Sequence, residues 1–229
     1  MNKFKMVLLF VGFSLFSFAQ NANISGNIST NNVQRLPFEE RKLIGDTEVR
    51  EGSPYLNGDD FKKVNIPGYS SNVPDLRYNA FSDEMEFLNG KDTYSANKEN
   101  GQIIKFIDGK IYECLNYNLE GKDKFGYLVQ LVHNPEKYSL YKREKVELLK
   151  GEKSPNGITK DRNDYYAKEK DIYIIRKNET FTKMAKNKKG FFSDLSLKSD
   201  EVEKFIKEKQ INFKSEADLI KLVTYMNTL

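Results

Sequence analysis

Turn signals divide the middle of this chain into short segments, and this spacing limits the fold more than any other feature. Asn89-Gly90 and Asp108-Gly109 each separate two runs in which apolar and polar residues alternate. Asn-Gly and Asp-Gly dipeptides favour two-residue hairpin turns. Such signals recur about every 8 to 14 residues between residues 52 and 183, which is typical of an all-β unit. We therefore predict an antiparallel β-sheet there, arranged as a meander, sandwich or open barrel.

Alternation and turn residues together place the individual strands of this unit. The expected strands span 76–80, 84–88, 92–96, 103–107, 110–117, 125–132, 138–149, 171–176 and 180–183. For 138–149 a charged helix remains an alternative, because Leu140, Val146 and Leu149 fit neither the strand period nor the helix period.

The apolar period changes after Lys183, from two residues to three or four. Ser199 can cap a helix that carries Val202, Phe205 and Ile206 on one face. Ser215 opens a second pattern, Ser-Glu-Ala-Asp, which resembles a capping box. Its apolar stripe would be Leu219, Leu222, Val223 and Met226. The sequence thus predicts an α+β domain in which two or three short helices within 184–229 follow the β unit of 52–183.

The first nineteen residues have the features of a cleavable export signal. Lys3 and Lys5 precede an apolar run from Val7 to Phe18, and Ala19 is a suitable residue before a cleavage site. The apolar run is about 12 residues long, whereas a membrane-spanning helix needs about 20. We expect an exported chain with no transmembrane span after cleavage, located in the periplasm, at the outer membrane or outside the cell. Residues 20–51 would then form a flexible leader.

Charge and residue usage exclude several classes of function. The formal net charge of +4 falls to +2 once Lys3 and Lys5 are removed, and acidic residues accompany nearly every basic cluster. Nucleic-acid binding would require a basic stripe, so we expect no nucleic-acid partner. With one cysteine, Cys114, and one histidine, His133, the usual zinc site is excluded. We expect Cys114 to be a buried thiol, and we expect no metal and no cofactor.

Four residues could in principle perform acid–base chemistry. Asp83, Glu84 and Glu86 form the densest acidic cluster, and His133 lies in a loop before Pro135. Glu84 and Glu86 are two residues apart, so both side chains would lie on one face of a strand. They could act as a carboxylate pair. The favoured interpretation is that Met85 and Phe87 face the core while both glutamates face water.

Tyrosines occur on nearly every expected strand. If several of them shared an exposed face, they would form a binding surface, and Arg77, Tyr78, Tyr112 and Tyr127 are the candidates. If they instead alternate into the sheet, they contribute to packing, which the sequence favours.

Two blocks of the sequence resemble a set of uncharacterised exported bacterial proteins. These blocks are Gly52-Ser53-Pro54-Tyr55-Leu56 and the segment from Leu76 to Phe87, together with the closing stretch from Ala217 to Leu222. The resemblance implies a β-rich middle and short C-terminal helices, but no activity. It marks 77–86 as the first segment to test.

The sequence favours a non-enzymatic role, because it contains none of the usual catalytic motifs. We expect an envelope or extracellular binding or structural module whose partner is an envelope protein, a glycan or a cell-wall component. The alternative is a carboxylate-dependent hydrolase acting on a glycan or cell-wall substrate.

Overall fold

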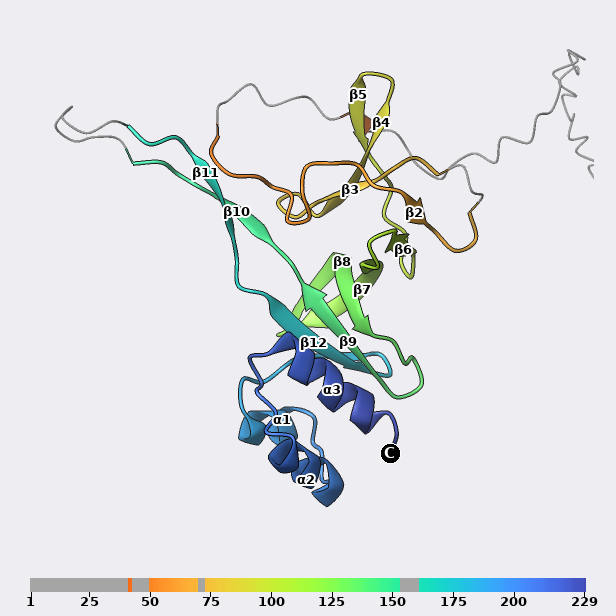
Figure 1. Cartoon of the computed structure of the whole chain (residues 1–229), viewed down its shortest axis with the longest axis vertical. Coiled ribbons are helices and arrows are strands. Elements are labelled where there is room, and N and C mark those ends of the chain that lie inside the picture. The colour runs from red at the N-terminus through yellow and green to blue at the C-terminus, as the bar shows by residue number, and fades with distance from the viewer. Residues whose placement is uncertain (1–40, 43–49, 70–72, 153–160) are drawn as a thin grey trace, which may run out of the picture. The chain divides into compact units, whose positions relative to one another are not determined.

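The computed structural model describes residues 41–42, 50–69, 73–152 and 161–229. The expected export signal (1–19) lies outside the described residues, and so does most of the expected leader (20–51). The structure is α+β, consisting mainly of antiparallel strands followed by three short C-terminal helices (Figure 1).

The strands form two main sheets and a two-stranded ribbon, and all the pairings between named strands are antiparallel. The smaller sheet has the order β1 (Arg41–Lys42), β5 (Asp92–Ser95), β4 (Glu84–Asn89) and β3 (Arg77–Asn79). The larger sheet has the order β13 (Thr180–Lys183), β12 (Ile172–Lys177), β9 (Tyr138–Arg143), β8 (Lys122–Val132), β7 (Ile111–Leu119), β6 (Ile103–Phe106) and β2 (Val64–Asn65). The ribbon pairs β10 (Val146–Leu149) with β11 (Tyr165–Lys168).

The expected strands are present, with one segment divided in two. Residues 138–149 form β9 and β10, so the charged-helix alternative is wrong for this segment. Glu144 and Lys145 separate the two strands, and the chain passes there from the large sheet to the ribbon. The sequence did not predict β1, β2 or β11. β1 lies within the segment 20–51 that was expected to be a flexible leader, β2 is the short edge strand of the large sheet, and β11 is one strand of the ribbon. Short strands at edges have few buried residues, and their apolar alternation is correspondingly weak.

The helices are α1 (Lys188–Asp194), α2 (Asp200–Glu208) and α3 (Glu216–Met226). Ser199 and Ser215 cap α2 and α3 as predicted, and each hydroxyl accepts a hydrogen bond from a backbone N–H of the first turn. Asn187 caps α1 in the same way. The α3 helix packs against β8 and β9, and α2 packs against α3. Figure 1 shows α3 lying across the sheet, with α1 and α2 beyond it.

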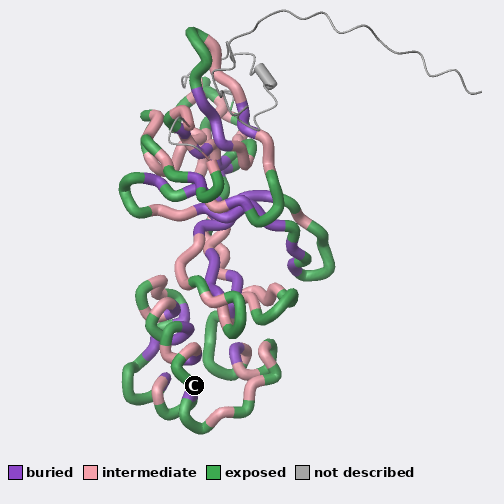
Figure 2. The backbone as a smooth tube through the Cα atoms, turned by 90° about the vertical axis from the view of Figure 1, so that its right-hand side faces the viewer, coloured by how far each residue is buried: buried purple, intermediate pink, exposed green. Residues whose placement is uncertain are grey.

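Three clusters of buried side chains hold these elements together, and buried positions gather within the sheets while hairpin tips are exposed (Figure 2). The tyrosine-rich core is Ile66, Leu76, Tyr78, Ala80, Met85, Phe87, Ala96, Ile104, Phe106, Tyr112, Cys114, Tyr127, Val129 and Val146. The helical core is Leu140, Ile175, Met184, Phe191, Val202, Ile206, Ile211, Phe213, Leu219, Leu222, Val223 and Met226. A smaller third cluster is Leu115, Tyr117, Leu119, Leu128, Tyr141 and Ile174.

Candidate functional site

Asp83 occupies the turn between β3 and β4 and connects it to β8. Its backbone has a φ of 57°, a left-handed conformation that Asp tolerates better than most residues. Its carboxylate accepts hydrogen bonds from the Tyr78 hydroxyl (2.8 Å) and the Tyr127 N–H (3.1 Å), and it forms an ion pair with Lys98 (2.8 Å). A Cβ at Gly126 would collide with this carboxylate. Asp83 therefore has a structural role at the junction of the two sheets.

Glu86 is buried, which corrects the expectation that it faces water. Its carboxylate lies 2.7 Å from Arg77 Nη2 and also accepts hydrogen bonds from Asn79 Nδ2 (2.7 Å) and the Tyr55 hydroxyl (3.0 Å). The Arg77 guanidinium in turn lies 3.8 Å from the centre of the Tyr55 ring. Burial, and then the Glu86 charge, raise the pKa of Tyr55. The alternation of buried and exposed residues along the strand does not hold at Glu86. Its carboxylate can be buried because three buried or partly buried side chains donate hydrogen bonds to it.

Glu84 is partly buried and lies opposite Asn79 in the sheet, while Glu86 lies opposite Arg77. Of the three carboxyl groups proposed as catalytic, Asp83 and Glu86 are thus each committed to an ion pair and to further hydrogen bonds.

The candidate tyrosines pack in the core rather than forming an exposed face. Tyr78, Tyr112 and Tyr127 are each at most 3% exposed. The ring centres of Tyr78 and Tyr112 are 4.6 Å apart, and those of Tyr78 and Tyr127 are 6.1 Å apart. Arg77 is held by Glu86 between aromatic rings. None of these four residues offers the exposed binding surface that the sequence allowed.

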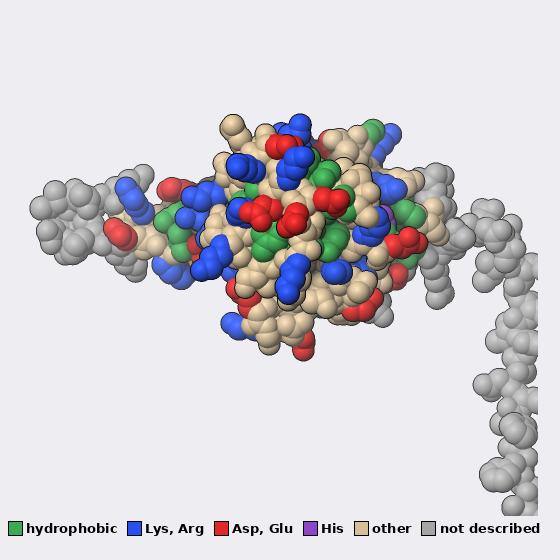
Figure 3. Space-filling view, turned by 90° about the horizontal axis from the view of Figure 1, so that it is seen from below, with side chains coloured by type: hydrophobic (Ala, Val, Ile, Leu, Met, Phe, Trp, Pro, Cys, Tyr) green, Lys and Arg blue, Asp and Glu red, His purple; other side chains and the backbone are tan. Residues whose placement is uncertain are grey.

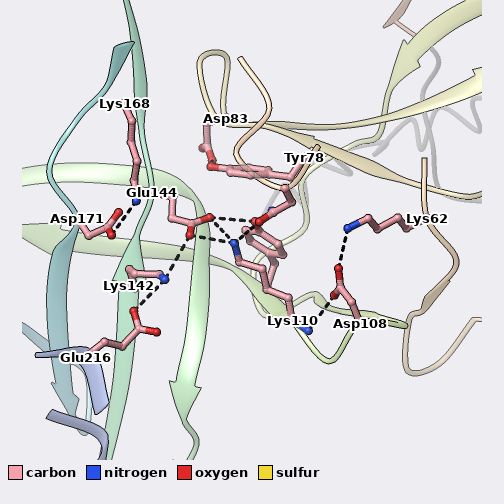
Figure 4. A network of polar contacts seen from close by, with 12 residues as sticks. Lys62, Tyr78, Asp83, Asp108, Lys110, Lys142, Glu144, Lys168, Asp171 and Glu216 are labelled. Carbon is pink, nitrogen blue, oxygen red and sulfur yellow. Dashed lines mark hydrogen bonds and ion pairs between the residues drawn. The ribbon is translucent and has the colours of Figure 1, made fainter. Parts of the chain in front are cut away.

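A network centred on Glu144 connects the tyrosine-rich core to the helices (Figure 4). The Glu144 carboxylate is 2.7 Å from Lys110 Nζ and 3.3 Å from Lys142 Nζ, and it accepts a hydrogen bond from the Tyr112 hydroxyl (3.1 Å). Lys142 also reaches Glu216 at the start of α3, at 2.8 Å. Burial raises the pKa of Glu144, but the two lysines outweigh burial and hold it below its ordinary value. Burial likewise lowers the pKa of Lys110, against the opposing charge of Glu144.

No sequence pattern singles out Glu144. It lies in the run Lys142-Arg143-Glu144-Lys145, and a run of charges normally indicates an exposed segment. The run instead covers the end of β9 and the corner that leads into β10, where the chain passes from the large sheet to the ribbon.

Cys114 and His133 lie in different environments. Cys114 is fully buried in the tyrosine-rich core, and burial raises the pKa of its thiol to about 12. His133 is exposed, and its Nδ1 lies 3.0 Å from the side-chain amide of Gln130. A thiol with this pKa is protonated at neutral pH and is a poor nucleophile.

An open cavity of about 300 Å³, here called the aromatic pocket, lies where the β3–β4 turn meets β8 and the β9–β10 corner. Its walls include Phe81, Asp83, Phe125, Tyr127, Arg143 and Lys145. Phe81 and Phe125 are 42% and 44% exposed, so two large apolar side chains face solvent on the walls of one cavity. The pocket thus adjoins the segment 77–86 that the sequence marked for testing, but its exposed rings belong to residues that sequence reasoning missed. One sequence signal for the pocket was available: Phe81 is a large apolar residue within the turn-rich stretch that follows Ala80.

A larger groove, of about 1000 Å³, lies between the β11–β12 corner, the end of β13 and the loop before α3. Its walls carry lysines, acidic residues and apolar side chains. Lys168 forms an ion pair with Asp171, and Glu169 forms one with Lys145, which lies outside the groove. The helical end seen in Figure 3 has the same character, with side chains of both charges interspersed. Neither the larger groove nor the helical end therefore concentrates one kind of side chain.

Among the described residues there is no group of three or more histidine, cysteine, aspartate or glutamate side chains placed to hold a metal ion. No helix within the described ranges has the length and apolar character to cross a membrane. A scan against protein-family models, a search of curated proteins and a search of solved structures gave no match for this chain.

Proposed function

We propose that this chain is an exported, non-enzymatic binding module of the cell envelope or extracellular space, and that it binds its ligand in the aromatic pocket. The observation that carries the proposal is the exposure of Phe81 and Phe125 on the walls of one cavity. Exposed apolar side chains that converge on a concave surface are typical of binding sites.

The surroundings of the pocket support binding rather than hydrolysis. A carboxylate-dependent hydrolase needs one carboxyl group that exchanges a proton and a second that remains ionised. Asp83 and Glu86 are instead held by Lys98 and Arg77. Both carboxylates serve to hold β3 and β4 in place beside the pocket.

The proposal is tested by co-sedimentation of the chain from Gln20 onward with insoluble cell-wall material and, separately, with outer membranes. We expect saturable binding that is lost in the double variant Phe81→Ala/Phe125→Ala. Leu88→Ala is the matched control, because Leu88 is also a half-exposed apolar residue, at the end of β4 and outside the pocket.

The supernatants of the same samples are assayed for released sugars and peptides. Binding without release supports the proposal. Release that is abolished by Glu84→Gln or Glu86→Gln would overturn it in favour of a hydrolase, and binding unaffected by the double phenylalanine variant would overturn the assignment to the pocket.

A further inference from the structure

Arg143, the last residue of β9, lines the aromatic pocket with a guanidinium that has few acceptors. Its side chain is only 20% exposed, and its one ion pair in the described part of the chain is a 3.7 Å contact with Glu169. The Tyr117 hydroxyl, which also lines the pocket, is its other polar neighbour. The Nε of Arg143 is buried and has no hydrogen-bond acceptor among the described residues. A guanidinium has five N–H donors, and burying it without acceptors is unfavourable. Arg143 therefore has unused capacity to bind an anionic group at its exposed end.

The charge balance of the pocket points in the same direction. Two carboxylates line the pocket, those of Asp83 and Glu144. Asp83 pairs with Lys98, and Glu144 pairs with Lys110 and Lys142, so lysines outside the pocket neutralise both. The cationic side chains of the pocket are Lys124, Arg143 and Lys145. Glu169 is the acidic partner of the last two, at 3.7 Å and 2.5 Å. An excess of positive charge remains, which favours an anionic ligand.

The size and the walls of the pocket indicate what carries the negative charge. A volume of about 300 Å³ lies at the small end of ligand sites and suits a compact ring rather than an extended chain. Phe81 and Phe125 provide apolar faces for such a ring, and Arg143 can bind a carboxylate through two parallel hydrogen bonds.

We propose that the aromatic pocket binds a carboxylate-bearing sugar, the uronate unit of an acidic glycan. The sugar ring packs against the two phenylalanine rings, and its carboxylate is bound by Arg143, with Lys124 adding positive charge. This inference rests on the proposed function and specifies its ligand.

The test is a calorimetric titration of the chain from Gln20 onward with a galacturonate trisaccharide and with the matching neutral galactose trisaccharide. We expect the uronate to bind more tightly by about tenfold or more, as the loss of a charge-assisted hydrogen bond implies. Because the attraction is between charges, the affinity for the uronate should fall with added salt while that for the neutral sugar should not.

Two variants separate a recognition role of Arg143 from a structural one. Arg143→Lys keeps the charge but loses the planar fork, and it should reduce uronate affinity about tenfold while leaving neutral-sugar affinity unchanged. Lys124→Gln, at a partly exposed position, should weaken uronate binding more modestly without altering the folded state. Circular dichroism and urea unfolding show whether either variant is folded.

Each outcome supports or overturns the inference. Equal binding of both sugars, lost in the double phenylalanine variant, would overturn the assignment of a carboxylate and leave the proposed function intact. No binding of either sugar, with envelope binding that still depends on Phe81 and Phe125, would overturn the assignment of a sugar. If an oligoglutamate peptide binds as tightly as the galacturonate trisaccharide, the assignment of a sugar is likewise overturned. If the unmodified chain does not bind envelope material, the proposed function itself is contradicted.

Discussion

The tyrosine-rich core and the helical core are built on different principles within one chain. Charged and hydroxyl groups surround the first core, where Asp83 and Glu144 receive hydrogen bonds from the hydroxyls of Tyr78 and Tyr112. The second core consists of aliphatic side chains, phenylalanine and methionine, and serine or asparagine caps its helices. A core that includes ionised groups fixes the positions of its elements through directional contacts, whereas an apolar core depends on shape and area. The aromatic pocket lies beside the first kind of core, where Asp83 and Arg143 need defined positions.

The largest expected effect comes from breaking the polar network at its centre. Glu144→Gln removes the charge that balances two partly buried lysines, Lys110 and Lys142. Removing one partner from a buried ion pair leaves an uncompensated charge, so we expect a loss of about 3 to 5 kcal/mol in the free energy of unfolding. Urea denaturation followed by circular dichroism measures this loss.

The matched control for this variant is Lys62→Gln, which breaks the more exposed ion pair with Asp108. Exposed pairs contribute about 0 to 1 kcal/mol. If the two variants lost the same stability, the polar network would have no special structural role.

The corresponding perturbation of the helical core is Leu222→Ala. Leu222 is fully buried on α3, so its truncation should cost about 2 to 5 kcal/mol through lost burial and an unfilled cavity. Unlike the Glu144 variant, it should leave the dependence of stability on pH unchanged. Urea denaturation of both variants at several pH values makes the comparison, and a changed pH profile for Leu222→Ala would contradict it.

pH should act mainly on the polar parts of the molecule. The pKa of Glu144 is lowered in the folded state, so its contribution is present above its ordinary value of 4.5 and is lost as the pH falls through the folded-state pKa. Burial raises the pKa of Tyr141 to about 12, so its contribution is present below 10 and is lost as the pH rises from 10 towards 12.

Stability should therefore decline at both extremes, and Glu144→Gln should remove part of the acid dependence. Tyrosinate absorbance recorded during alkaline titration should increase together with the loss of tertiary structure. Ionisation of all the tyrosines at their ordinary pKa, with the fold intact, would contradict this account.

Within the helical segment, the smallest expected effect is at a helix cap. Ser215→Ala removes the hydroxyl that accepts a hydrogen bond from the Asp218 N–H, and such caps contribute about 1 kcal/mol. Thermal unfolding should show a small shift that adds to that of Leu222→Ala. A loss as large as that expected for Glu144→Gln would indicate that α3 has a further role.

The sequence predicted the apolar half of the molecule better than the polar half. Ser199 and Ser215 begin their helices where expected, and the apolar stripe of α3 is buried, because burial of apolar area follows the helix period directly. Glu86 and Glu144 could not be found in this way. Their burial depends on partners distant in the chain, such as Tyr55 and Lys110, which no local pattern brings together. Phe81 and Phe125 were missed for the opposite reason, because an apolar residue is normally expected inside.

The proposed site is tested most directly by nuclear magnetic resonance, with ¹⁵N-labelled chain from Gln20 onward and increasing galacturonate trisaccharide. We predict that amide shifts change at the walls of the aromatic pocket, including Phe81, Gly126 and Lys145, and do not change along α3. Shift changes confined to the helices or to the larger groove beside β12 and β13, or none at saturating sugar, would contradict the assignment of the ligand to the aromatic pocket.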